Sequence, residues 1–199
     1  MASDMQHAGT RFDDVLDFWF SPPESRFRGR PRAEWFRKDP AFDEQIRARF
    51  LDCHRAAAEG RLDAWAATPY GGLALVIVLD QFPRNLFRNG ARAFASDARA
   101  LSVARNLLER RFDRTLRPLE RVFAYLPFEH GEDLAVQRRS LALFESLRLH
   151  ADCAGAIDYA WRHYAVIARF GRFPHRNAAL GRASTVEEIE FLRQPGSGF

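Results

Sequence analysis

The sequence predicts an all-α protein, and three observations support this class. Apolar residues recur at intervals of three and four along most of the chain, which is the spacing of one helix face. Prolines and glycines divide these stretches at short intervals. No two strand-like runs are present that could pair. We therefore expect about eight helices packed as successive antiparallel hairpins, in a single domain over residues 1–199, with residues 1–10 as a flexible N-terminus.

The first two helices are predicted from caps and apolar spacing. Residues 11–20 form a short amphipathic helix, and a loop rich in arginine, glycine and proline follows it. A second helix begins at Asp39-Pro40, because aspartate is a good N-cap and proline fits the first helical position, where its missing N–H costs nothing. Gly60 is placed to end this helix. Its expected buried face is Phe42, Ile46, Phe50, Cys53 and Ala57.

The most apolar stretch covers residues 70–82. Its run of residues 76–79 alone fits a buried strand as well as a buried helix. Since no second strand-like run is present to pair with it, we expect a fully buried helix, preceded by a short helix at residues 62–67. We expect this helix to end near Phe82, because Pro83 disfavours helical geometry in the residue before it. The apolar run is far shorter than the ~20 residues that span a bilayer, so it is a core segment.

Further helices are expected over residues 96–112, 116–126, 132–149, 155–170 and 184–194. Pro127 is expected to break the helix that precedes it, since proline removes a helical hydrogen bond. The last helix opens with Ser184-Thr185-Val186-Glu187, a capping-box pattern in which serine and glutamate satisfy each other's backbone donors. The expected inward face of the helix at 155–170 is Ile157, Trp161, Tyr164 and Ala168.

Composition and charge bear on partners and compartment. The formal net charge is +4, with arginines interspersed among acidic residues. Nonspecific nucleic-acid binders usually carry a basic stripe or tail, so we expect no nucleic-acid partner, and we expect no membrane association. Two cysteines, Cys53 and Cys153, are too few for a disulfide framework and are expected to be buried and reduced. The N-terminal residues do not resemble a secretory signal, so the expected compartment is the cytoplasm.

Two polar turns interrupt the helical pattern and are candidate sites. Residues 80–85 (DQFPRN) follow the most apolar helix, where a buried Asp80 is costly unless it is paired. A salt bridge to Arg84 is the structural interpretation, and a ligand contact is the functional one. Residues 126–133 (LPFEHGED) place His130 just before a helix start, where the acidic residues suit the positive end of the helix dipole. Capping is the structural interpretation, because one histidine beside two carboxylates is a weak metal signal.

The third candidate is the stretch 164–182 (YAVIARFGRFPHRNAALGR). His163, just before it, lies on a mostly apolar helix face, and such a histidine is more often a satisfied core residue than a catalyst. Arg169, Arg172 and Arg176 have few acidic neighbours in the chain. Either carboxylates from elsewhere in the fold neutralise them or a bound anion does, because planar guanidinium groups suit carboxylate and phosphate alike.

Several of these motifs together resemble a known bacterial family. The chain carries DQFPRNLFR at 80–88, FAxD at 94–97, YLPFEHGED at 125–133, RFGRFPHRNAALGR at 169–182 and the ending FLRQPGSGF. These motifs are similar to those of the family catalogued as domain of unknown function 924. The resemblance covers nearly the whole chain and implies a tetratricopeptide-repeat-like, all-helical superhelix with no established activity. That family usually has Met-His-Ser-Glu where residues 129–132 here are Glu-His-Gly-Glu, so this chain lacks the serine hydroxyl.

Two functions follow as hypotheses, and both an enzymatic and a non-enzymatic role stay open. In the first, the three turns converge on a cleft where arginines hold a small anionic ligand, a carboxylate or a phosphate, and histidines transfer protons, as in hydrolysis. In the second, the helices form a protein interaction scaffold and the polar motifs are internal struts. No metal ligand set and no cofactor is predicted. The expected catalytic residues are His163, His175 and His130. The expected ligand-binding residues are Asp80, Arg84, Asn85, Glu132, Asp133, Arg169, Arg172, Arg176 and Asn177.

Overall fold

The computed structural model describes residues 9–198, and within them the regular elements are all helical. The predicted all-α class is therefore confirmed. The expectation for residues 1–10 falls mostly on residues 1–8, which lie outside the described part of the chain. The α-helices are α1 (Phe12–Phe20), α2 (Pro40–Ala58), α3 (Pro69–Val76), α4 (Phe82–Leu86), α5 (Asp97–Glu109), α6 (Pro118–Glu129), α7 (Leu134–Glu145), α8 (Ala154–Phe170) and α9 (Val186–Leu192).

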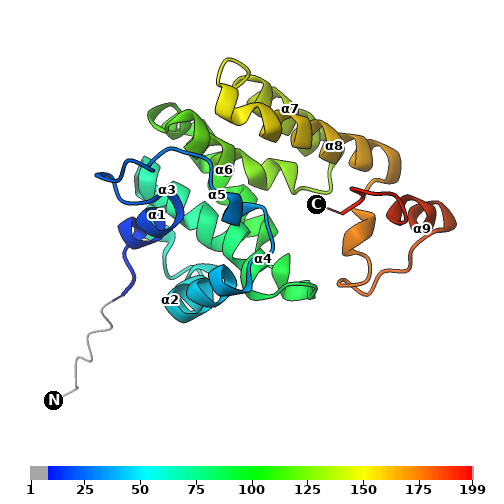
Figure 1. The fold of residues 1–199 in the computed structure, drawn as a ribbon, viewed down its shortest axis with the longest axis horizontal. Helices are drawn as coiled ribbons and strands as arrows, with labels where there is room; N and C mark the ends of the chain where they lie inside the picture. The colour runs from blue at the N-terminus through cyan, green and yellow to red at the C-terminus, as the bar shows by residue number, and fades with distance from the viewer. Residues whose placement is uncertain (1–8, 199) are drawn as a thin grey trace.

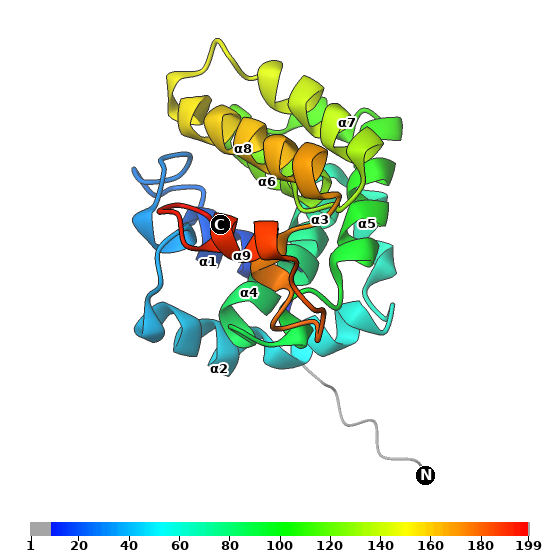
Figure 2. The same ribbon diagram turned by 90° about the vertical axis from the view of Figure 1, so that its right-hand side faces the viewer.

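The helices form two groups with the C-terminal segment against them (Figure 1). In one group α7 packs against both α6 and α8, so consecutive helices lie side by side as the hairpin prediction expects. In the other, α3 packs against α1 and α5, and α2 packs against α4. Because α3 and α5 both contact α6, these two helices join the groups. The segment after α8 folds back with α9 in front of α3 and α4 (Figure 2). A tetratricopeptide-repeat-like superhelix stays a prediction.

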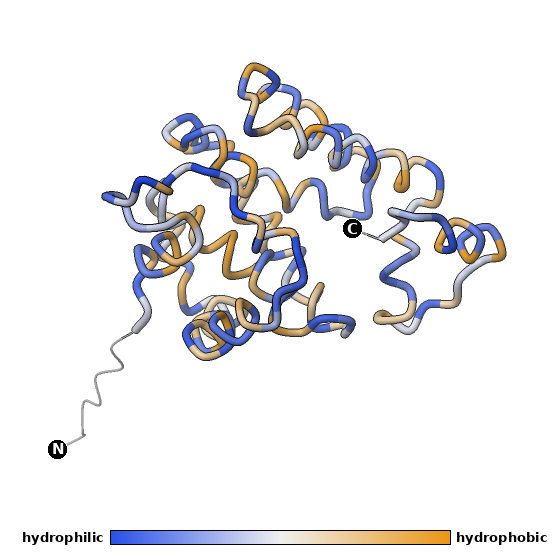
Figure 3. Tube along the Cα trace, viewed as in Figure 1, coloured by the Kyte–Doolittle hydropathy of each residue, from blue (hydrophilic) through white to orange (hydrophobic). Residues whose placement is uncertain are grey.

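The core is built around the apolar run that the sequence singled out. Residues Leu73 to Leu79 are all fully buried, and they appear at the hydrophobic end of the colour scale in Figure 3. They are helical, so the prediction of a buried helix in place of a strand is confirmed. Both cysteines are buried and free, as expected. No helix in residues 9–198 combines the length and the apolar character that crossing a lipid bilayer requires.

The end of this buried helix was predicted wrongly. In place of a stop near Phe82, the chain passes through a π-helical turn, η3 (Ile77–Gln81), and continues directly into α4. The backbone N–H of Phe82 reaches the carbonyl of Ile77, five residues back. Pro83 then stands in the first turn of α4, where a missing N–H is tolerated. With the π turn before it, the helical backbone continues through Pro83, where the prediction had ended it.

Two other local predictions were wrong. Helix α6 continues through Pro127 to Glu129, and its last residues are buried, so their packing offsets the hydrogen bond that proline removes. In α8 the buried face holds Ala160 and His163, whereas Trp161 is 49% exposed and donates its indole N–H to Glu145 across 2.9 Å. The prediction placed Trp161 inward because of its large apolar ring, and so assigned the wrong buried face to this helix.

The predicted caps differ in accuracy. Asp39 caps α2 by accepting hydrogen bonds from the next turn, and Gly60 follows the helix with a φ of 84°, which glycine adopts at little cost. The box at the start of α9 is shifted by one residue from the prediction. Thr185 accepts from the N–H of Glu188 across 3.2 Å, and Glu188 accepts from the N–H of Thr185 across 2.8 Å.

Candidate functional site

The three candidate turns meet at one junction. Asp80, in the π-helical turn, accepts a hydrogen bond from His130 at the end of α6, with 2.7 Å between Oδ1 and Nδ1. Glu132, in the turn after α6, accepts the backbone N–H of Phe173 across 2.7 Å. Phe173 opens the turn that contains His175 and Arg176. The first hydrogen bond joins two side chains 50 residues apart in the chain. The second joins a side chain to backbone 41 residues away.

Asp80 is the fully buried centre of this junction. Besides His130, its carboxylate accepts from the amide of Gln81 across 2.6 Å and lies 3.5 Å from Nη1 of Arg84, which also donates to its backbone carbonyl. Burial alone would raise the pKa of Asp80, but Arg84 and His130 lower it below its ordinary value. The buried carboxylate is therefore an anion that fixes the ring of His130. The expected salt bridge between Asp80 and Arg84 is present.

Asp97, at the start of α5, joins Arg84 to the C-terminal segment. Its two oxygens accept a fork from Arg84 at 3.0 and 3.1 Å, and Oδ2 also accepts from Nη1 of Arg176 at 3.2 Å. The guanidinium of Arg176 lies over the rings of Phe94 and Phe173, at 4.7 and 4.5 Å from their centroids. Two arginines thus share one carboxylate. Sequence reasoning did not place Asp97 among the site residues and missed this role.

Glu129 and His163 form a second buried contact beside Asp80. Nδ1 of His163 lies 3.2 Å from Oε1 of Glu129 and 2.9 Å from the carbonyl of Tyr159. Burial and the negative charge of Asp80 raise the pKa of Glu129 well above its ordinary value. Ring nitrogens of His130 and His163 and a carboxylate oxygen of Glu129 lie within 4.8 Å of one another. Sequence reasoning missed Glu129, because it reads as the end of an apolar helix.

The three histidines named as catalytic candidates lie in this junction or beside it. Burial, and after it the neighbouring Arg84, lower the pKa of His130. Burial and His130 lower the pKa of His163 to about 2, and burial and Arg176 lower the pKa of His175 to about 4. All three are therefore neutral near pH 7. A neutral imidazole is a base or a metal ligand and does not donate a proton as imidazolium would.

A comparison with known proteins identifies the family. The family described as bacterial proteins of unknown function, DUF924, matches residues 15–196. The chain belongs to DUF924. Among solved structures, a protein of unknown function from Agrobacterium tumefaciens, ATU0120, is 40% identical and superimposes with a TM-score of 0.81; the match covers 92% of this chain and 96% of that one. No curated protein matched the chain.

Several residues that the sequence placed in the site of this DUF924 chain point elsewhere. Asn85 donates to Asp43 of α2 across 2.8 Å, and Asp133 caps α7. Asn177 donates to Ser184 and to Glu188 within the C-terminal segment. These contacts of the three residues are those expected of structural residues, and the partners named here lie outside the Asp80 junction.

The arginines that lacked local acids find them elsewhere in the fold. Arg169 pairs with Glu187, and Arg172 forks onto Glu188 at 2.6 and 2.8 Å. Arg182 forks onto Glu132 at 2.6 and 2.9 Å. Carboxylates from other parts of the fold therefore neutralise these arginines, which is the first of the two alternatives that the sequence left open. Arg176 differs, because it shares the carboxylate of Asp97 with Arg84.

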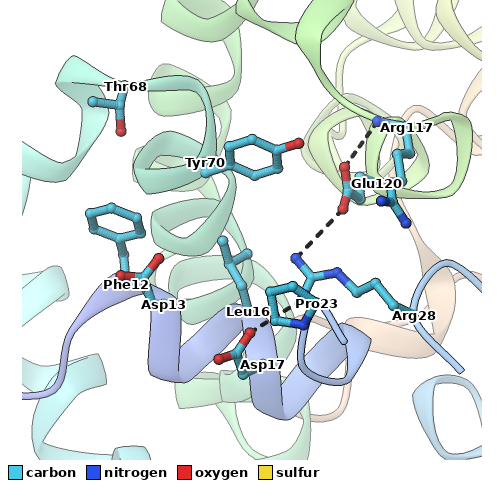
Figure 4. Close-up of a pocket in the computed structure, with 10 residues that line it drawn as sticks. All are labelled: Phe12, Asp13, Leu16, Asp17, Pro23, Arg28, Thr68, Tyr70, Arg117 and Glu120. Atoms are coloured by element: carbon cyan, nitrogen blue, oxygen red, sulfur yellow. Dashed lines mark hydrogen bonds and ion pairs between the residues drawn. The ribbon is translucent and has the colours of Figure 1, made fainter. Parts of the chain in front are cut away.

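One hollow among the described residues lies away from the junction (Figure 4). It has a volume of about 400 Å³ and is bounded by α1, the loop after it and the starts of α3 and α6. Arg28 lies at its rim, 3.2 Å from Asp17 and 3.8 Å from the buried Glu120 (Figure 4). The carboxylates of Asp17 and Glu120 thus have a cationic partner within the protein. None of the sequence-predicted site residues lines this hollow.

Proposed function

We propose that this DUF924 protein binds a small anion, a carboxylate or a phosphate group, at Arg176 and Arg84. The observation that carries the proposal is the state of Arg176. Its side chain is 7% exposed, it shares its carboxylate with Arg84, and its Nε has no hydrogen-bond partner in residues 9–198. Burial and Arg84 lower the pKa of Arg176 to about 10. A buried cation short of counter-charge is stabilised by an added anion.

The surroundings of Arg176 support the same conclusion. Phe94 and Phe173 flank the guanidinium plane, so the fork is held in one orientation before a ligand arrives. Preorganisation of this kind lowers the entropy cost of binding. His175 is next to Arg176 in the chain and is neutral near pH 7, so we propose it as the group that accepts a proton from a water molecule or a bound ligand, as in hydrolysis. No serine or cysteine is among the contacts described around Arg176.

A thermal-shift experiment tests the proposal with inorganic phosphate and acetate, each against chloride at equal ionic strength. A ligand present at about 100 times its Kd adds roughly 2.7 kcal/mol to stability. For a chain of this length that corresponds to a rise in Tm of roughly 5–10 °C. We expect the rise with one of the two anions, its loss in Arg176→Ala, and its persistence in Arg55→Ala, which removes a half-exposed arginine paired with the exposed Asp52.

The matched variant Arg176→Lys guards against a folding defect, since it keeps the charge but lacks the Nε donor and the planar fork. It should fold and show a smaller anion-dependent rise than the wild-type protein. An equal rise in Arg176→Ala, or no rise with phosphate and acetate in the wild-type protein, would overturn the proposal.

The interaction scaffold is the second candidate, and the pairing of the other arginines favours it. Arg172 and Arg182 are saturated by Glu188 and Glu132, so these groups hold the C-terminal segment in place without any ligand. In this reading Arg176 is a further strut on Asp97. The same titration separates the two candidates, because a strut gives no anion-dependent change in Tm.

A further inference from the structure

Glu129, His130 and His163 gather three metal-ligand side chains in one buried place. One oxygen of Glu129 and one nitrogen of each histidine lie within 4.8 Å of one another. Glu129 and His130 are consecutive at the end of α6, and His163 comes from the adjoining α8, so two packed helices supply the set. Two histidines and one carboxylate are the protein ligands of several catalytic zinc sites and of non-haem iron sites.

The histidines carry the outer contacts that metal ligands usually have. Nδ1 of His130 is 2.7 Å from Oδ1 of the anionic Asp80, and Nδ1 of His163 is 2.9 Å from the carbonyl of Tyr159. A carboxylate and a carbonyl accept hydrogen bonds, so each Nδ1 carries the proton and the lone pair of each ring is on Nε2. A ligating histidine almost always donates its other N–H to a carboxylate or a backbone carbonyl in this way.

The second oxygen of Glu129 adds an independent observation. Glu129 is 3% exposed, and its Oε2 is buried with no hydrogen-bond partner in residues 9–198. A buried carboxylate oxygen normally has a partner, because its desolvation is otherwise uncompensated. The contact with Nδ1 of His163 at 3.2 Å accounts for Oε1 of Glu129 but leaves Oε2 unexplained. A cation next to Glu129 would account for both.

We propose that Glu129, His130 and His163 bind one divalent transition-metal ion, with Asp80 holding His130 in the ligating orientation. The mixed nitrogen and oxygen set favours zinc, iron or cobalt over magnesium and calcium, which prefer oxygen ligands. Ligands of a tetrahedral zinc ion lie about 3.4 Å apart, so the three side chains close in by rotation when the ion binds. The proposed metal ligands are not the residues of the anion site, although the two sites adjoin through Asp80, which lies 3.5 Å from Arg84.

Cobalt binding to the full chain tests the proposal. A chelator first removes metal from the protein, and the protein is then titrated with Co²⁺. The visible absorption of bound Co²⁺ measures binding, and Zn²⁺ is added at the end to displace the Co²⁺. We expect one equivalent of Co²⁺ per chain, released by zinc. His163→Ala and the isosteric Glu129→Gln should abolish binding, and Asp80→Asn should weaken it by about 10–100-fold, as for other outer partners of metal ligands.

His150→Ala is the matched control, since it removes an exposed histidine outside the cluster. Circular dichroism shows whether each variant is folded, and Glu129→Gln keeps the test usable if His163→Ala is not. Unchanged cobalt binding in Glu129→Gln, equal losses in His150→Ala and His163→Ala, or no binding at all would overturn the metal site. The phosphate and acetate titration repeated on Glu129→Gln reports the Arg176 site separately, so either proposal can fail alone.

Discussion

At the scale of single residues, Asp97 is the carboxylate on which two segments depend. It is the first residue of α5 and contacts Arg84 of α4 and Arg176 of the C-terminal segment. The side chains of all three are at most 22% exposed. Removing one member of such a buried ionic group leaves the others without compensation, which is far more costly than removing an exposed charge.

We therefore expect Asp97→Asn to lower the free energy of unfolding by about 3 kcal/mol, measured by urea denaturation. The reason is that both guanidinium groups stay buried while their shared negative charge is lost. Asp52→Asn is the control, because the Asp52 side chain is 90% exposed and pairs only with Arg55, so its removal costs less than about 1 kcal/mol. Equal losses in the two variants would contradict this account of Asp97.

At the scale of elements, close backbone contact explains one glycine of the buried helix. A Cβ atom added at Gly71 in α3 would stand 2.2 Å from the backbone carbonyl oxygen of Trp65. The preceding turn, η2 (Asp63–Ala67), is packed directly on the start of α3. Gly155 in the first turn of α8 is the opposite case, since nothing lies within 4 Å of an added Cβ.

We expect Gly71→Ala to reduce stability by roughly 1–3 kcal/mol through overpacking against backbone that cannot move aside. Gly155→Ala should instead raise stability by up to about 1 kcal/mol, because alanine loses less backbone entropy in a helix. Thermal unfolding of both variants, recorded under one set of conditions, measures the difference. A neutral Gly71→Ala would show that the turn and the helix are less tightly packed than described.

At the scale of the whole molecule, ion pairs hold the segment that follows α8. Arg172 contacts Glu188 within this segment, and Arg182 reaches back to Glu132 in the turn after α6. Phe173 and Phe191 of this segment join a small apolar cluster with Val166, Ile167 and Phe170 of α8. The attachment of the segment should therefore respond to pH more than the apolar core does.

Glu188 determines whether stability rises or falls as the pH is lowered. The hydrogen bonds from Arg172 lower its pKa to about 2, from an ordinary value of 4.5. A carboxylate with a lowered folded-state pKa contributes stability above about pH 4.5 and loses it as the pH falls toward 2. We expect the free energy of unfolding to fall across this window and to fall less in Glu188→Gln, measured by denaturant titration at several pH values. Glu187→Gln, at the exposed neighbouring carboxylate, should keep the wild-type dependence.

The sequence predicted the fold class from the spacing of its apolar residues and the family from its motifs. Helix α2 is a case in point, with its Asp39 cap and its regular apolar face. The partners of the arginines were not predictable in this way, since Asp97 and Arg176 are 79 residues apart. The exposed Trp161 was missed for a related reason. Which face of α8 is buried depends on α7 and α6, and hydrophobic spacing within α8 alone favoured the other face.

The π-helical turn at Ile77–Gln81 sets the rotation of everything that follows it in α4. Each residue of a helix advances the side chains by about 100° around its axis. Deleting one residue in this turn would restore an ordinary helix but swing Arg84 away from Asp97 and Asn85 away from Asp43. A change in the length of this segment therefore rotates α4 relative to its partners, whereas amino-acid exchanges within it leave that rotation unchanged.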